Sequence, residues 1–105
     1  MSLTPVYTTA FKKDFKRLEK RGVDQEKLRR VIKLLLAEIP LEEQYRDHPL
    51  RGKFAGARDC HIEPDWVLIY AVVENELRLI RTGSHTDLFK LTALNNVLLF
   101  WVNRR

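Results

Sequence analysis

The apolar residues of this chain change their spacing once, near residue 53, and that change constrains the fold more than any other feature of the sequence. Before it, "AFKKDFKRLEKRG" places Phe11, Phe15 and Leu18 on one face of a predicted helix that stops at Gly22. A second helical stripe follows, and Pro40 is predicted to end it. Its members are Leu28, Val31, Ile32, Leu35, Leu36 and Ile39. Thr8 or Thr9 is predicted to cap the first helix, and Asp24 the second.

After residue 53 the pattern is that of β-strands. "KFAGARDCHIE", "DWVLIYAVV" and "LRLIRTG" are separated by the short turns "EPD" and "ENE". Strands joined so tightly are antiparallel neighbours. "LTPVYTT" near the N-terminus predicts one more strand, at an edge of the sheet because it contains Pro5. Helices grouped before strands predict an α+β fold, with the two helices packed on an antiparallel sheet.

The length of 105 residues, without repeats or a linker, predicts one domain spanning residues 1–105. The tail "KLTALNNVLLFWVNRR", residues 90–105, has near-helical apolar spacing and predicts a C-terminal helix, with a strand as the alternative. No signal peptide is expected, and no apolar run is long enough to span a bilayer. Cys60 is the single cysteine, which excludes an intramolecular disulfide and indicates a reduced, cytoplasmic protein with Cys60 in its core.

Positive charge is concentrated on the predicted helices. The net charge of +5 favours polyanionic partners such as RNA. The basic residues of this region are Lys12, Lys13, Lys16, Arg17, Lys20, Arg21, Lys27, Arg29, Arg30 and Lys33. They form either a phosphate-binding surface or an ordinary solvated face, and their spacing does not choose between these two interpretations.

Three histidines, His48, His61 and His85, lie beside predicted turns or strand ends. None forms a short ligand spacing with another, and the lone cysteine provides no CxxC pair, so no metal site or cofactor is expected. Antiparallel pairing returns Arg81 and His85 to the sheet end that carries His61 and Asp65.

Two histidines, an aspartate and an arginine suit the cleavage of RNA. The attacking 2′-hydroxyl must lose a proton, the leaving 5′-oxygen must gain one, and the phosphorane needs a cation. Arginine is suited to this last task because its planar fork matches phosphate oxygens. Ser84 is then not needed as a nucleophile, since the attacking group belongs to the RNA. Trp66 and Phe89 either stack a base or pack in the core.

Three motifs carry a family resemblance. "YRDHPLRG", "RDCHIEPDWVLIY" and "RTGSHTDLF" together resemble the YafQ branch of the RelE/ParE superfamily, the toxins of bacterial type II toxin–antitoxin modules. The resemblance runs from the first helix to about Phe89, with the motifs in the family's order. It implies a small RelE-like α+β fold and mRNA cleavage on the translating ribosome, without metal, by 2′-hydroxyl attack that leaves a cyclic phosphate.

The resemblance also implies roles for single residues. The family's catalytic positions fall on His48, His61, Asp65, Arg81, His85 and Phe89. His85 would be the general acid, His61 or Asp65 the general base, and Arg81 the phosphate ligand supported by His48. Phe89 would orient a base, with Trp66 in support. A DinJ/RelB-like antitoxin would neutralise the toxin, and operator DNA would be bound only through that antitoxin.

The tail departs from this pattern, because such toxins usually stop soon after the "LF" motif. It either completes the core or folds over the site, which would block activity. Two other functions therefore stay open. The chain could be a non-catalytic ParE-like binder of a protein such as gyrase, or a degenerate toxin that binds only an antitoxin.

Overall fold

A computed structural model describes residues 2–88 of the chain. Its elements, in order, are β1 (Thr4–Tyr7), α1 (Thr9–Lys20), α2 (Glu26–Leu36), η1 (Glu43–Tyr45), β2 (His48–Pro49), η2 (Gly52–Phe54), β3 (Arg58–Glu63), β4 (Trp66–Val73) and β5 (Glu76–Ser84). Residues 85–88 form one further helical turn. The α+β class is confirmed. Phe89 and the predicted tail helix, residues 90–105, lie outside the described residues.

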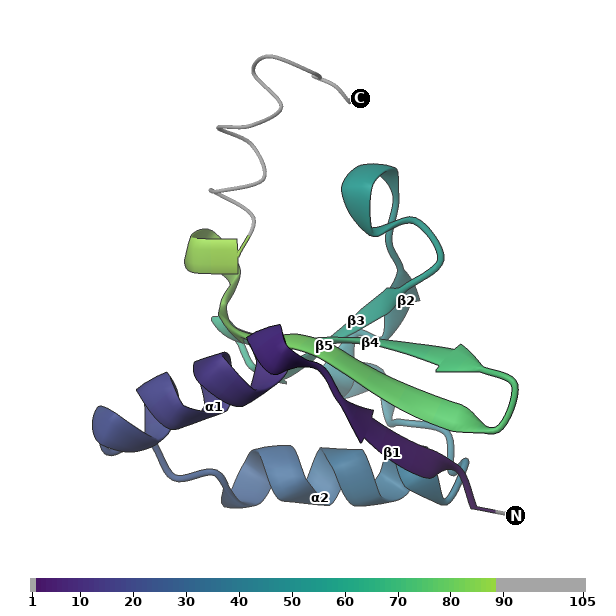
Figure 1. Cartoon of the computed structure of the whole chain (residues 1–105), viewed down its shortest axis with the longest axis horizontal. Coiled ribbons are helices and arrows are strands. Elements are labelled where there is room, and N and C mark those ends of the chain that lie inside the picture. Colours follow the sequence, from purple (N-terminus) through teal and green to yellow (C-terminus); the bar gives the residue numbers. More distant parts are fainter. Residues whose placement is uncertain (1, 89–105) are drawn as a thin grey trace.

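The described strands form one sheet in the order β1-β5-β4-β3-β2. Helices α1 and α2 cover one face of the sheet, while η2 and residues 85–88 stand on the other face (Figure 1). The predicted antiparallel pairing of β3, β4 and β5 is confirmed. The edge position of β1 is also confirmed, but β1 runs parallel to β5. Strand β2 was not predicted, because two residues are too few to show an alternation.

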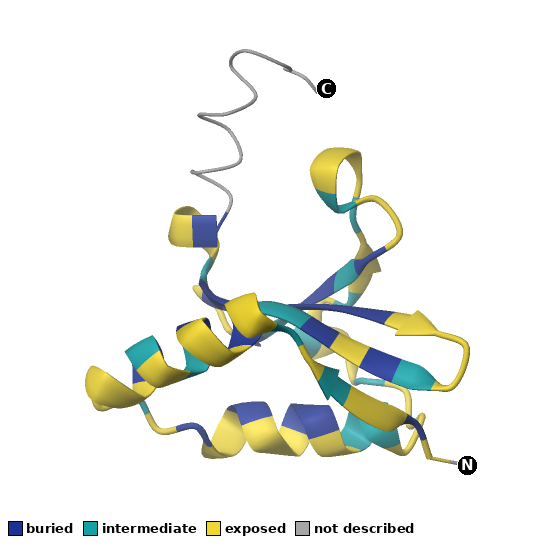
Figure 2. Ribbon diagram, viewed as in Figure 1, coloured by how far each residue is buried: buried dark blue, intermediate teal, exposed yellow. Residues whose placement is uncertain are grey.

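The main core lies between the sheet and the two helices. Phe11, Leu28 and Val31 from the helices meet Leu68, Leu77 and Leu79 from the strands. Figure 2 shows these inner faces as buried and the outer faces of the helices as exposed. Cys60 lies in this core as predicted, and burial raises the pKa of its thiol to about 12. None of the helices within residues 2–88 combines the length and apolarity needed to cross a bilayer.

The helix ends follow the sequence signals only in part. The Phe11 N–H donates to Thr8 Oγ1 at 3.1 Å, so the predicted cap of α1 is confirmed. Helix α2 begins after Gln25 instead of Asp24, although the Asp24 carboxylate accepts from the Glu26 N–H at 3.0 Å.

The predicted extent of the α2 stripe is wrong at its C-terminal end. Helix α2 ends at Leu36, where Glu38 adopts a left-handed φ of 59° and the Ile39 N–H donates to the Leu34 carbonyl. This closing turn leaves Ile39 50% exposed instead of buried on the stripe. The turn at Glu38, not Pro40, therefore stops the helix.

A bulge in β5 sets which side chains reach each face. Tyr70 pairs with Leu79, but Ile69 pairs with Arg81, so Ile80 is the extra residue. Leu79 faces the helices, whereas Ile80 packs against a second cluster on the opposite face. The bulge also places Arg81 across from Ile69, which belongs to that second cluster. Simple alternation along "LRLIRTG" would have put Arg81 on the helix face.

Candidate active site

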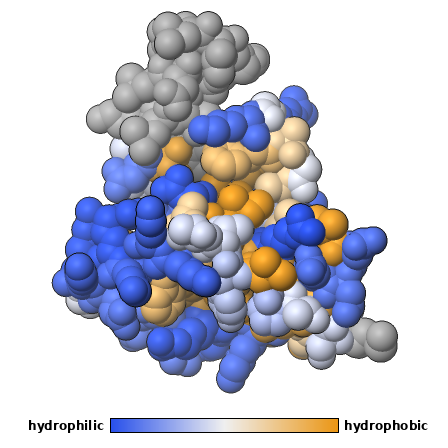
Figure 3. Space-filling model, viewed as in Figure 1, coloured by the Kyte–Doolittle hydropathy of each residue, from blue (hydrophilic) through white to orange (hydrophobic). Residues whose placement is uncertain are grey.

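The sheet face opposite the helices carries two of the three histidines. In the register of the sheet, His48 lies opposite Asp59, and His61 lies opposite Val67. Directly opposed residues point to the same face, and Val67 belongs to the second cluster. Figure 3 shows apolar residues exposed above the sheet between η2 and residues 85–88, with hydrophilic residues around them. His48, His61, Asp59 and His85 form what we call the histidine patch.

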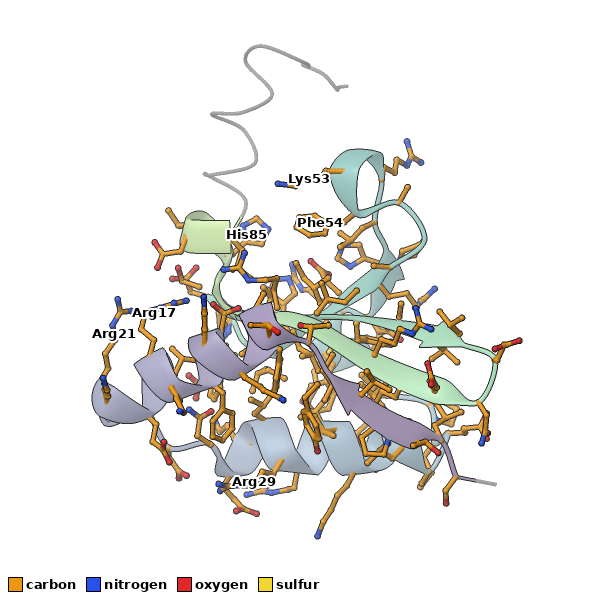
Figure 4. The ribbon with its side chains drawn as sticks, viewed as in Figure 1. Arg17, Arg21, Arg29, Lys53, Phe54 and His85 are labelled. Atoms are coloured by element: carbon orange, nitrogen blue, oxygen red, sulfur yellow. The ribbon has the colours of Figure 1, made fainter. Side chains whose placement is uncertain are left out.

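His61 and His85 stack on one another. Their ring centroids are 6.0 Å apart, at an interplanar angle of 30°. The β3–β4 turn holds both residues, because the His85 N–H donates to the Asp65 carbonyl at 3.3 Å and His61 Nδ1 lies 3.2 Å from the Pro64 carbonyl oxygen. In Figure 4 the His85 side chain and Phe54 of η2 extend toward the same space above the sheet. The structure therefore brings together the two imidazoles that strand pairing predicted at one end of the sheet.

Asp59 is the acidic member of the patch, and sequence reasoning missed it. The residue is 1% exposed, with Oδ1 at 3.1 Å from His48 Nε2. Burial raises the pKa of Asp59, while the charges of His48, His61 and His85 partly offset that effect. A carboxylate influenced by all three histidines is a candidate for controlling their protons. The strand pattern gave no signal for it, because Asp59 follows Arg58 like an ordinary solvated residue.

The His48 ring lies between the Arg46 carbonyl oxygen and the Asp59 carboxylate. His48 Nδ1 lies 2.6 Å from the Arg46 carbonyl oxygen, which can only accept, so Nδ1 carries a hydrogen. A neutral His48 would then turn the lone pair of Nε2 toward an ionised Asp59, and two acceptors at 3.1 Å would repel one another. No described group makes a well-aligned hydrogen bond to Asp59 Oδ1, so the contact is mainly electrostatic.

Arg81 is held by a second buried aspartate, Asp14 of α1. Arg81 Nε donates to Asp14 Oδ2 at 2.6 Å and Nη2 to Oδ1 at 3.1 Å, while Arg17 and the Thr82 N–H also donate to this carboxylate. Burial opposes the ionisation of Asp14, but the bonds from Arg81, Arg17 and Thr82 outweigh it and lower the pKa of Asp14. Asp14 occupies the open edge of β5 beyond Leu79, where β1 no longer pairs.

Two other predicted site residues lie elsewhere. Asp65 is exposed in the turn before β4, and its carboxylate makes no hydrogen bond or ion pair within residues 2–88. Trp66 is 7% exposed in the main core, and its Nε1–H donates to Thr82 Oγ1 at 2.9 Å. This burial favours the packing interpretation of Trp66 over base stacking. Phe89, the other aromatic candidate, lies outside the described residues.

The basic residues of α1 are separate from the histidine patch. Lys12, Lys13 and Lys16 line a groove between α1 and α2, and none of them lines the cleft that contains His61. Figure 4 shows Arg21 extending from α1 away from His85, whereas Arg17 Nη2 donates to Asp14 Oδ1, an oxygen that also binds Arg81. The three lysines can bind phosphates of a large partner, but the structure does not place them beside the histidines.

Among the described residues, no cluster of three or more histidine, cysteine or carboxylate side chains is arranged to hold a metal ion. The side chains of the patch offer proton transfer by imidazoles beside a buried carboxylate, and the register places Arg81 on the same face of the sheet.

Comparisons with known proteins place this geometry in a family. The model of the YafQ family, described as bacterial toxins of type II toxin–antitoxin systems, matches residues 3–90. The mRNA interferase toxin YafQ of Escherichia coli K12 is 45% identical over 84 residues, covering 79% of this chain and 91% of that protein.

Solved structures of toxins also match this fold. The Escherichia coli DinJ–YafQ toxin–antitoxin complex matches with a TM-score of 0.78 at 42% identity, covering 85% of this chain and 99% of that one. A metal-bound toxin from Helicobacter pylori matches with a TM-score of 0.77 at 44% identity, covering 83% and 99% of the two chains.

Proposed function

The chain belongs to the YafQ family of bacterial toxins of type II toxin–antitoxin systems, and from this premise we propose that it is an endoribonuclease that cleaves mRNA on the translating ribosome. The observation that carries the proposal is the pair of imidazoles, His61 and His85, stacked 6.0 Å apart. Two titratable rings so placed can remove one proton and supply another across a phosphodiester. A toxin that only binds a protein target has no need of such a pair.

The reaction needs only groups of the RNA and the protein. The 2′-oxygen of the RNA attacks the adjacent phosphorus, the bond from phosphorus to the 5′-oxygen breaks, and a 2′,3′-cyclic phosphate and a 5′-hydroxyl result. His61, alone or with Asp65, takes the proton of the 2′-hydroxyl, and His85 gives a proton to the leaving 5′-oxygen. Both proton transfers use side chains, so the proposed mechanism requires no metal or other cofactor.

Arg81 is proposed to stabilise the charge on the phosphate. Asp14 binds its Nε and Nη2 groups, which leaves Nη1 to face a substrate and holds the guanidinium in one orientation. We propose that His48 supports Arg81 in this role, and that the Asp59 carboxylate beside His48 acts through its charge. Phe89 is proposed to orient a base.

The proposed partners follow from the same premise. A DinJ/RelB-like antitoxin would bind and neutralise the chain in the cytoplasm, and operator DNA would be bound only through that antitoxin. Lys12, Lys13, Lys16 and Arg17 are proposed to bind ribosomal RNA through their positive charge on α1, the three lysines apart from the reacting groups and Arg17 beside Arg81.

Induction of the protein alone in a bacterial host tests the proposal. The wild-type chain should arrest growth and cleave translated mRNA. His85→Ala should lower the cleavage rate by roughly 100-fold or more, as expected for loss of a general acid, and should restore growth. Thr86→Ala is the matched control, since Thr86 is the exposed next residue of the same helical turn and should leave both effects unchanged.

Three results would contradict the proposal. If wild-type cells grow normally with intact mRNA, the chain is a degenerate toxin. Growth arrest with intact mRNA would indicate a non-catalytic toxin acting on a protein target. Full activity of His85→Ala would exclude His85 as the acid.

A further inference from the structure

A cleft adjoins the histidine patch where β3 continues beyond its pairing with β2. It has a volume of about 490 Å³ and lies between the first half of α2, the η1 segment and the end of β3. Lys27 and Arg30 line it from α2, Tyr45 and Arg46 from η1 and the residue after it, and His61 from β3. His61 thus borders both the cleft and the patch in which it stacks on His85.

The cleft holds two arginines whose charge is not balanced by the protein. Within residues 2–88, the side chains of Arg30 and Arg46 make no ion pair and no hydrogen bond, and both residues are exposed. By contrast, Arg81 of β5 binds Asp14 and Arg58 of β3 binds Asp47. The one acid lining the cleft, Glu63, is paired with Lys27 at 2.8 Å. The unbalanced charge is therefore positive.

The backbone connects this cleft to the patch. Arg46 adopts a left-handed φ of 49°, a conformation that is uncommon for a residue other than glycine. Its carbonyl oxygen lies 2.6 Å from His48 Nδ1, so the residue that presents a free guanidinium to the cleft also fixes the ring of His48. Strained backbone of this kind is found at functional sites.

We propose that this cleft binds the mRNA strand next to the scissile bond, with Arg30 and Arg46 holding one of its phosphates. The inference rests on the proposed function, because it extends the path of the same strand past His61. Free guanidinium groups match phosphate oxygens in a bidentate geometry. The half-buried ring of Tyr45 supplies the aromatic wall that single-stranded RNA sites combine with positive charge.

Binding to ribosomes with and without mRNA tests this inference. The mRNA carries 2′-deoxyribose throughout the exposed codon, so the attacking hydroxyl is missing and the strand stays intact. Arg30→Ala and Arg46→Ala should each raise Kd for mRNA-programmed ribosomes about tenfold, which corresponds to about 1.4 kcal/mol. Kd for mRNA-free ribosomes should stay unchanged. Arg78→Ala is the matched control, because Arg78 is an exposed arginine of β5 that is already paired with Glu76 and lines neither this cleft nor the groove between the helices.

Arg46→Lys should recover part of the affinity, because it restores the charge without the planar fork. Unchanged Kd values on both kinds of ribosome would overturn the inference. An equal loss on both would assign the cleft to ribosomal RNA and would also overturn the inference. An equal loss for Arg78→Ala would overturn it as well. Cleavage of all-ribose mRNA is measured separately. Wild-type protein that binds as expected but does not cleave would refute the proposed function alone.

Discussion

At the scale of single residues, Asp59 carries a conflict between stability and function. Its carboxylate is 1% exposed and Oδ1 makes no well-aligned hydrogen bond within the described residues. Burial raises its pKa, so the folded state resists the ionisation that neutral pH imposes. We expect that this carboxylate controls the protonation of the three histidines near it, and that its burial lowers the stability of the fold.

Asp59→Asn should therefore stabilise the folded protein and lower its rate of RNA cleavage. Because the pKa of Asp59 is raised on folding, its ionisation costs stability as pH rises above the ordinary carboxyl value, and costs nothing at acidic pH where both states are protonated. The free energy of unfolding of the variant should exceed that of the wild type by on the order of 1 kcal/mol at pH 7. The difference should shrink toward pH 3. Urea unfolding at several pH values measures this effect. The cleavage rate should fall roughly tenfold or more.

A variant that is less stable than the wild type at pH 7 would contradict this account of Asp59. So would a stability gain that is independent of pH, since the gain is attributed to the removal of an ionising group.

The sequence could predict His61 and His85 at one end of the sheet, because tight turns between strands leave only antiparallel pairing. The sequence could not predict Asp59 as the partner of His48, or Asp14 as the partner of Arg81. Asp14 meets Arg81 across 67 residues of sequence, and only the packing of α1 against the open edge of β5 brings them together. Asp59 becomes distinctive only once β2 places His48 beside it.

At the scale of elements, the junction of β1, α1 and β5 positions Arg81. Thr8 Oγ1 accepts from the Phe11 N–H, and its one O–H is shared between the carbonyls of Leu79 at 2.9 Å and Ile80 at 3.0 Å. Ile80 is the extra residue of the bulge. One hydroxyl therefore caps the helix and fixes the strand at the point where its register shifts. Asp14, which lies six residues after Thr8 in α1, then reaches Arg81.

Thr8→Ala should lower the free energy of unfolding by about 1–2 kcal/mol, because it removes the cap together with its bonds to β5. Thr9→Ala is the matched control, since Thr9 is the exposed first residue of α1, and it should change stability by less than about 0.5 kcal/mol. Chemical denaturation of both variants makes the comparison. Equal losses for the two would show that the hydroxyl of Thr8 has no special role.

Periodicity predicted both helices and the three long strands, because each buries one regular stripe or face. It did not predict the parallel pairing of β1, whose partner lies at the far end of the described chain. The bulge at Ile80 also has no signature in "LRLIRTG", yet it decides which face Arg81 occupies.

At the scale of the whole molecule, the sheet separates two tasks. The helices and the main core lie on one face, and the histidine patch lies on the other, where only η2 and residues 85–88 flank it among the described residues (Figure 1). The cleft at the edge of β3 joins the patch through His61. A rigid sheet thus presents the reacting groups along one path for an RNA strand, as scaffolds with functional edges commonly do.

The central claim is that these side chains cleave RNA by using its own 2′-hydroxyl. The most direct measurement is the chemistry of the cut ends, on ribosome-bound mRNA with ribose or 2′-deoxyribose at the scissile nucleotide. The account predicts a 2′,3′-cyclic phosphate and a 5′-hydroxyl from the ribose strand, and no cleavage of the deoxyribose strand. A 5′-phosphate end, or cleavage at the 2′-deoxyribose, would contradict it.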